Sequence, residues 1–109
     1  MSQLSEKRCI PCEGGTLPLS RSEAEVFLKQ VNGWALSKDA CAIHKEFKFK
    51  NFAQAMDFGN AVARIAEEEE HHPDLSISWG KVDIHLTTHA IKGLSENDFI
   101  LAAKVDKIA

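Results

Sequence analysis

Two adjacent histidines and a proline, His71, His72 and Pro73, come directly after a run of four glutamates. Imidazole changes charge near neutral pH, so histidines beside carboxylates are suited to proton transfer. On a helix, Glu67 lies four residues before His71 and Glu68 four before His72, so each pair can meet on one face. Because proline cannot continue a helix, we expect the histidines at a helix C-terminus, where the dipole favours a cation. A solvated acidic helix end that merely carries histidines is the alternative.

Length and composition predict one soluble globular domain. The chain has 109 residues, of which 44% are hydrophobic and 27% charged, and this length allows a core without disulfides or metals. The net charge of −3 argues against a general nucleic-acid binder. Neither an apolar signal region nor a run long enough to span a membrane is visible, so we expect a cytoplasmic protein without membrane contact.

The three cysteines, Cys9, Cys12 and Cys41, do not suggest a disulfide framework, because their number is odd and no signal peptide is visible. Cys9 and Cys12 have Cys-x-x-Cys spacing, but residues 13–15 (Glu-Gly-Gly) indicate a loop rather than the helix N-terminus that a redox motif needs. A zinc site would need two further ligands. An isolated spacing match therefore favours a surface arm over a functional pair.

Hydrophobic periodicity predicts an N-terminal arm, residues 1–19, followed by a single domain, residues 20–109. The arm is polar and then rich in Gly and Pro, which indicates a loop rather than a packed element. Lys45 interrupts the row of apolar residues in the strand 43–49. Gly59 indicates that the helix beginning at residue 52 packs closely against a neighbour. Ser95 with Asp98 resembles a capping box at the start of the last helix. The expected elements are helix 21–31, strands 34–36 and 43–49, a helix from residue 52 to 70 or 71, strands 75–79 and 82–87, and a last helix opened by residues 94–98.

The order of these elements, α-β-β-α-β-β-α, defines the expected fold class. Two hairpins supply four short strands, which can form one antiparallel sheet. Three amphipathic helices then cover one face of this sheet. The sequence therefore predicts an α+β fold with a four-stranded antiparallel sheet and three helices on one face.

The five histidines do not form a recognisable metal motif. His85 and His89 are four residues apart, but on a strand that separation spans roughly 13 Å. His71 and His72 point in different directions on a helix, no His-Glu-x-x-His pattern exists, and His44 and His85 are interpreted as ordinary strand histidines. Nucleotide-binding and nucleophile-elbow motifs are absent too. Residue chemistry alone therefore predicts a site that transfers protons without a metal or cofactor. Isomerisation, dehydration and tautomerisation are reactions of this kind.

A set of spaced residues nevertheless resembles the signature of the pterin-4a-carbinolamine dehydratases. The resemblance extends over nearly the whole chain, and the segment of residues 12–15 is similar to bacterial members. The residues that carry the signature are Glu67, His71, His72, Pro73, Trp79, His89 and Asp98, with the block Thr87 to Asp98.

The resemblance implies a hydro-lyase of tetrahydrobiopterin biosynthesis and recycling. Its reaction is the dehydration of 4a-hydroxytetrahydrobiopterin to quinonoid dihydropterin and water, without a metal or other cofactor. It implies that His71, His72 and His89 are catalytic. We hypothesise that His71 is the acid at the departing hydroxyl, oriented by Glu67, that His72 holds or deprotonates the ring, and that His89 is a second acid–base group. The implied substrate-binding residues are Glu67, Pro73, Trp79, Thr88 and Asp98, the last as electrostatic support.

The resemblance also implies partners and leaves alternatives. Phenylalanine hydroxylase is an implied metabolic partner, and a homodimer or homotetramer is expected. One alternative is a protein-interaction module of the dimerisation-cofactor or transcriptional-coactivator kind. Another is a role in a different pterin pathway such as molybdopterin metabolism. The intact set of His71, His72 and His89 favours the enzyme, because a module that only binds has no chemical need for it.

Overall fold

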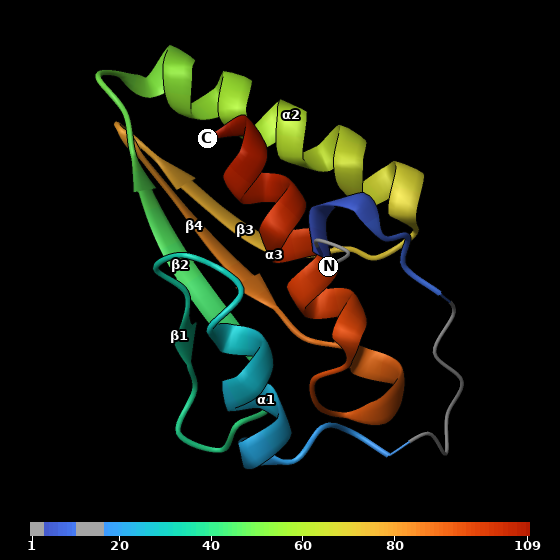
Figure 1. Ribbon diagram of the computed structural model, residues 1–109. Helices are drawn as coiled ribbons and strands as arrows, with labels where there is room; N and C mark the ends of the chain where they lie inside the picture. Colours follow the sequence, from blue (N-terminus) through green and yellow to red (C-terminus); the bar gives the residue numbers. More distant parts are fainter. Residues whose placement is uncertain (1–3, 11–16) are drawn as a thin grey trace.

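The computed structural model describes residues 4–10 and 17–109, whose helices lie on one face of a four-stranded antiparallel sheet (Figure 1). The predicted α+β fold and element order are confirmed. None of the helices within these two ranges combines the length and the hydrophobicity that a membrane-spanning segment requires. The elements are η1 (Leu4–Glu6), α1 (Arg21–Leu28), β1 (Ala35–Leu36), β2 (Ile43–Lys48), α2 (Phe52–Glu69), β3 (Asp74–Ser78), β4 (Lys81–Leu86), η2 (His89–Ile91) and α3 (Glu96–Ile108).

The sheet joins the two predicted hairpins through its central strands, in the order β1-β2-β4-β3. Period-two alternation places Ile43, Ile84 and Leu86 on the helix-covered face, where each is fully buried. The other face carries His44 and His85, which are paired across β2 and β4 with ring centroids 5.2 Å apart. The sheet therefore has one apolar and one wet face, as the alternation predicts.

The first helix is shorter than predicted, because the chain after it changes to hydrogen bonds that span three residues in place of four. Expected to reach residue 31, α1 ends at Leu28, and the Gln30 and Val31 N–H groups bond to carbonyls three residues back, at 2.9 and 3.3 Å. Val31 is still buried, and Gly33 follows with a φ of 76°. The apolar pattern extends beyond the end of the helix because Val31, although outside α1, still packs into the core.

Helix α2 delivers the chain to the histidine pair. Its N-cap Asn51 accepts from the Gln54 N–H at 2.8 Å. Gly59 packs against β3, since a Cβ there would lie 2.6 Å from Ile77 Cδ1, in agreement with the predicted close packing. The helix ends at Glu69, and Glu70 turns it with a left-handed φ of 53°. The histidines therefore follow the helix and do not occupy its last turn.

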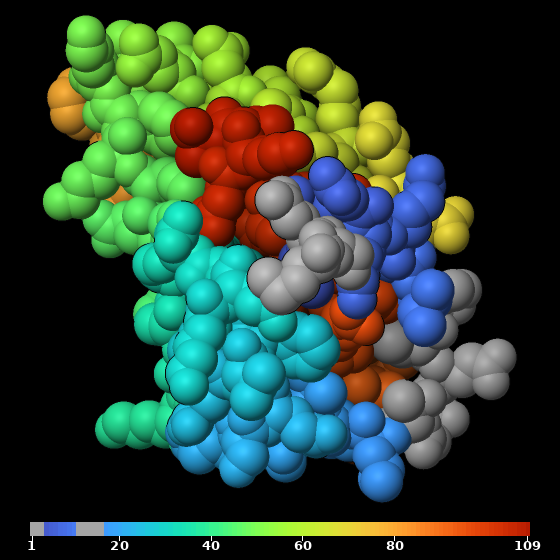
Figure 2. All heavy atoms as spheres, viewed as in Figure 1, coloured from blue at the N-terminus to red at the C-terminus, as the bar shows by residue number. Residues whose placement is uncertain are grey.

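Residues 4–10 correct the prediction of an unpacked arm over residues 1–19. Leu4 is only 4% exposed within the core, and Lys104 Nζ donates to the Ser5 carbonyl at 3.0 Å. Lys7 and Glu96 form an ion pair at 2.6 Å. Figure 2 shows this segment, in blue, lying over α3 and beside the end of α2. Its partners lie about 90 residues away, so local composition could not reveal the packing. The rest of the predicted glycine-rich loop, with Cys12, lies outside the described residues.

Lys45, which breaks the apolar row of β2, has a specific set of partners. Its Nζ donates to Asp106 Oδ1 at 2.8 Å and to the Asn32 carbonyl at 2.6 Å. Trp34 Nε1 also donates to Asp106, at 3.1 Å. One carboxylate on α3 thus satisfies a half-buried cation and an indole, and it ties the first hairpin to the last helix.

We expect Asp106→Ala to lower the free energy of unfolding by about 1–3 kcal/mol, because Lys45 and Trp34 lose their shared acceptor. Urea unfolding at fixed protein concentration measures this. The matched control is Asp57→Ala on the exposed surface of α2, which should change the free energy of unfolding by no more than about 0.5 kcal/mol. Equal effects of the two variants would contradict this account of Lys45.

Candidate active site

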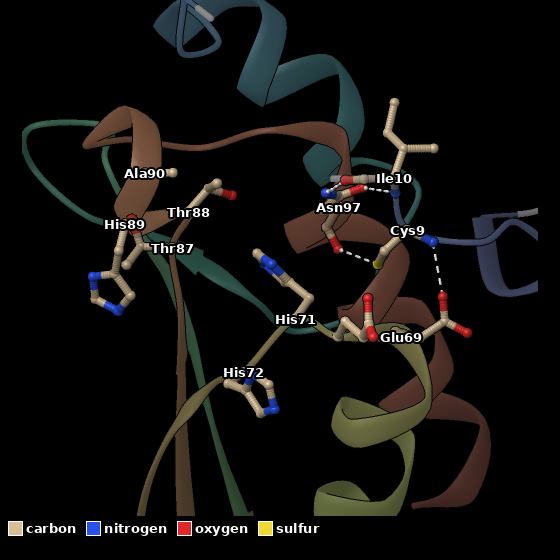
Figure 3. A pocket seen from close by; sticks show the side chains of 11 residues that line it. Cys9, Ile10, Glu69, His71, His72, Thr87, Thr88, His89, Ala90 and Asn97 are labelled. Atoms are coloured by element: carbon tan, nitrogen blue, oxygen red, sulfur yellow. Dashed lines mark hydrogen bonds between the residues drawn. The ribbon is translucent and has the colours of Figure 1, made fainter. Parts of the chain in front are cut away.

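A pocket of about 270 Å³ opens where α2 ends, between the segment after β4 and the start of α3 (Figure 3). Three distant parts of the chain meet here: residues 9–10, the end of α2 with the two histidines that follow it, and the segment from Thr87 to Asn97. The lining residues are Cys9, Ile10, Glu69, Glu70, His71, His72, Thr87, Thr88, His89, Ala90 and Asn97.

His71 is held by a buried carboxylate. Its Nε2 lies 2.6 Å from Asp98 Oδ1, and the two side chains are 11% and 0% exposed. A carboxylate accepts hydrogen bonds, so the proton of the neutral ring sits on Nε2 and is donated to Asp98. The other ring nitrogen, Nδ1, is then free of a proton and can accept one. The arrangement fixes both the orientation and the tautomer of His71.

Asp98 is itself held by three donors from separate parts of the site. Its Oδ2 accepts from the Thr88 hydroxyl at 2.8 Å and from the Ser95 N–H at 3.0 Å, while its Oδ1 accepts from His71. The predicted capping box of Ser95 and Asp98 is therefore present. The residue that caps α3 also anchors His71, so the helix start and the site depend on one carboxylate.

Glu67 pairs with His72 and not with His71, which corrects the predicted orientation of His71 by Glu67. Glu67 Oε2 lies 2.5 Å from His72 Nε2, and the two side chains are 76% and 62% exposed. The expected spacing of four residues assumed a continuous helix, but the left-handed Glu70 breaks it. An exposed pair of this kind contributes little to stability.

His89 approaches the pocket from the side opposite the end of α2. It opens η2 directly after Thr88, and Figure 3 shows its ring on the side of residues 87–90, across from Asn97. The structure therefore brings the predicted residues His71, His72, His89 and Thr88 to one pocket. That these histidines act as acids or bases stays a prediction.

The other predicted substrate-binding residues lie outside the pocket lining. Asp98 is behind His71, and Glu67 is beside His72. Pro73 precedes β3, whereas Trp79 follows it and is 73% exposed. Because a strand rises about 3.3 Å per residue, Trp79 lies roughly 20 Å from Pro73. Trp79 is thus not among the residues that line this pocket, and its role in substrate binding stays a prediction.

Several lining residues were not predicted from the sequence. Asn97, which is 4% exposed, could have drawn attention as the neighbour of Asp98 in the capping segment. Cys9 and Ile10 reach the site from about 60 to 90 residues away in sequence, and no local pattern signals that contact. The other unpredicted residues are Glu69, Glu70, Thr87 and Ala90.

Cys9 is an inert thiol in this setting. Burial, followed by the nearby Glu69 and Asp98 carboxylates, raises the pKa of the thiol to about 12. Its Sγ lies 3.6 Å from the Asn97 carbonyl oxygen. Since the thiolate is the nucleophile and the metal ligand, Cys9 is unsuited to either role at neutral pH.

We expect iodoacetamide to alkylate Cys9 at pH 8 at least about a hundredfold more slowly than it alkylates glutathione, because almost no thiolate forms at that pH. The rate should rise about tenfold with each pH unit above 8 as the thiolate forms, and should level off only near the pKa of the thiol. Tandem mass spectrometry of peptide fragments resolves Cys9 from Cys12 and Cys41, and unfolding in guanidinium should abolish the protection of Cys9. Labelling of native Cys9 at the rate of glutathione would contradict the burial seen here.

Among the described residues, no three His, Cys, Asp or Glu side chains are arranged to hold a metal ion. The polar groups that line the pocket are imidazoles, carboxylates, two threonine hydroxyls, a thiol and an amide. These groups bind polar rings by hydrogen bonds, and the imidazoles can exchange protons with them.

Comparison with known proteins identifies the family. Residues 17–108 match the family described as pterin 4 alpha carbinolamine dehydratase. A relative from Halorhodospira halophila, provisionally named a pterin-4-alpha-carbinolamine dehydratase, is 50% identical over 96% of both chains. One from Alkaliphilus metalliredigens with the same provisional name is 51% identical over 98% of this chain and 96% of its own. The chain therefore belongs to the pterin-4-alpha-carbinolamine dehydratase family, as its signature residues indicated.

Solved structures agree with this assignment. The crystal structure of a transcriptional coactivator/pterin dehydratase from Brucella melitensis is 36% identical, with a TM-score of 0.80 over 84% of this chain and 98% of that one. A pterin dehydratase-like protein described as a RuBisCO assembly factor in the alpha-carboxysome is 28% identical, with a TM-score of 0.62 over 72% of this chain and 90% of that one. Relatives with this fold thus carry names from more than one functional class.

Proposed function

We propose that the protein dehydrates 4a-hydroxytetrahydrobiopterin to quinonoid dihydropterin and water, in tetrahydrobiopterin recycling. The observation that supports this most directly is the meeting of His71, His72 and His89 at one pocket, with His71 held by the buried Asp98. Membership of the family supplies the substrate class. A pocket of about 270 Å³ whose walls mix apolar surface with polar groups is suited to a flat bicyclic ring that carries hydrogen-bonding groups.

The reaction needs an acid and a base but no net proton. The bond between C4a and its hydroxyl oxygen breaks, and that oxygen takes a proton from an acid and leaves as water. N5 loses its proton to a base, and the electron pair of that N–H bond forms the C4a–N5 double bond. Both transfers suit imidazoles, whose ordinary pKa lies near neutrality.

We assign the acid at the departing hydroxyl to His71, acting through Nδ1. Asp98 orients the ring and stabilises the imidazolium that carries the proton to be given. Asp98 thus takes over the orienting role that was expected of Glu67. His72 holds the ring or accepts the N5 proton, with Glu67 as its partner, and His89 is a second acid–base group on the facing wall.

We expect the wild-type protein to accelerate the decay of 4a-hydroxytetrahydrobiopterin, followed by stopped-flow ultraviolet absorbance. His71→Ala should lower kcat about 10²- to 10⁴-fold and change KM far less, because the acid acts in the transition state. The matched control is His44→Ala on the open face of the sheet, which should retain wild-type rates. A His71→Ala variant changed only in KM would make His71 a binding residue. Wild-type decay at the spontaneous rate would refute the proposal.

Replacing Asp98 or Glu67 by its amide distinguishes the contribution of the His71–Asp98 pair to catalysis from that of the His72–Glu67 pair. Asp98→Asn should lower kcat at least about tenfold, because an amide nitrogen facing Nε2 favours the wrong tautomer and cannot stabilise the imidazolium. Glu67→Gln should have a clearly smaller effect, since that pair is exposed to solvent. The same absorbance assay measures both variants, with circular dichroism to verify folding. A larger loss in Glu67→Gln would reverse the assignment of the acid.

A second candidate is an interaction module, because the Brucella melitensis relative is named a transcriptional coactivator as well as a dehydratase and another relative is described as an assembly factor. The His71–Asp98 pair favours the enzyme, since binding of a protein does not require an oriented, buried imidazole. An inactive wild type in the assay above would favour the module. A role in molybdopterin metabolism would instead appear as activity on a different pterin.

We further propose a homodimer or homotetramer and phenylalanine hydroxylase as the metabolic source of the substrate. The outer strand β3 leaves one side of its backbone unpaired within the described ranges, and strands of this kind can pair across a two-fold axis. Light scattering coupled to size exclusion gives the assembly state.

A further inference from the structure

Residues 9–10 form one side of the pocket, and Asn97 holds them there. The Asn97 Oδ1 accepts from the Ile10 N–H at 3.0 Å, and its Nδ2 donates to the Ile10 carbonyl at 2.5 Å. The asparagine thus satisfies both main-chain groups of one residue, as a neighbouring β-strand would. Figure 3 shows this pair and Cys9 on one side of His71, opposite Thr88 and His89.

A second anchor ties the same segment to the end of α2. Glu69 Oε1 accepts from the Cys9 N–H at 2.8 Å, and Glu69 Oε2 lies 3.7 Å from Lys104 Nζ. Lys104 in turn donates to the Ser5 carbonyl. Glu69 and Asn97 are 9% and 4% exposed, so both anchors are buried groups with little alternative solvation. The segment is therefore held on both flanks by buried polar side chains.

The position of this segment in the sequence sets it apart from the rest of the site. The family match begins at residue 17, so residues 9–10 precede it, whereas the histidines, Thr88 and Asn97 lie within it. The segment brings no group suited to proton transfer, because the thiol of Cys9 stays protonated. Its place in the lining therefore points to binding rather than to chemistry.

We propose that residues 9–10 are a binding wall of the pterin pocket and that Asn97 is the positioning residue that seats this wall. The proposal rests on the proposed pterin site. The wall covers one side of the bound ring and excludes water from it, while Asn97 and Glu69 occupy the main-chain N–H groups of the wall and hold it in place. Its loss should weaken binding of pterins while leaving most of the proton transfer intact.

The test compares wild type with Asn97→Ala, which leaves the Ile10 N–H and carbonyl without this partner. Isothermal titration with 7,8-dihydrobiopterin, a stable pterin, gives Kd, and the stopped-flow assay gives kcat and KM. We expect Kd and KM to rise about tenfold, kcat to fall less than about threefold, and the Ile10 amide to exchange hydrogen faster than in wild type. The matched control is Asn60→Ala on the exposed surface of α2, which should behave as wild type.

A second variant keeps the test valid if Asn97→Ala does not fold. Ile10 is 70% exposed, so Ile10→Pro removes the N–H donor with little effect on the core, and it should raise Kd in the same direction. If Asn97→Ala speeds hydrogen exchange at the Ile10 amide but leaves Kd and KM unchanged, the proposed binding role of residues 9–10 is wrong. A wild type that does not bind 7,8-dihydrobiopterin would also overturn it. If the wild type binds 7,8-dihydrobiopterin but does not accelerate the dehydration, only the proposed dehydratase activity is refuted. The Kd values of the variants would still test the binding role of residues 9–10.

Discussion

Asp98 is a fully buried carboxylate with three hydrogen-bond donors, which come from the segment after α2, the segment after β4 and the start of α3. Ser95 supplies the start of α3, Thr88 the segment after β4, and His71 the segment after α2. Burial of a carboxylate is unfavourable unless its oxygens are satisfied, so the meeting of these three segments stabilises the fold. The requirement that stabilises the fold is therefore the same one that orients the candidate acid.

The consequence for chemistry is a division between the two adjacent histidines. His71 is almost enclosed and paired with a buried partner, whereas His72 and Glu67 face solvent. The left-handed residue Glu70 ends the helix directly before the pair, and the two rings then find different partners, Asp98 for His71 and Glu67 for His72. Two identical side chains thus acquire different environments, which is the usual basis for giving acid and base separate tasks.

Much of the fold was predictable because it depends on local pattern. Alternation in β4 and the helical period after Asn51 gave the order of elements, and the Ser95–Asp98 capping box is local as well. The errors lie where a local rule was extended beyond its range. Glu67 was paired with His71 by assuming a continuous helix, and the arm was judged by composition although Leu4 packs into the core.

The sequence by itself determined the α+β fold class, which follows from periodicity, and the family signature, whose resemblance indicated the histidines that meet at the pocket. Only the tertiary structure decided that Asp98 holds His71, that Trp79 lies away from the pocket and that Cys9 and Ile10 line it. The physical reason is that these relations join residues from 27 to about 90 positions apart. Contacts of that range are set by how the elements pack, and no local preference encodes them.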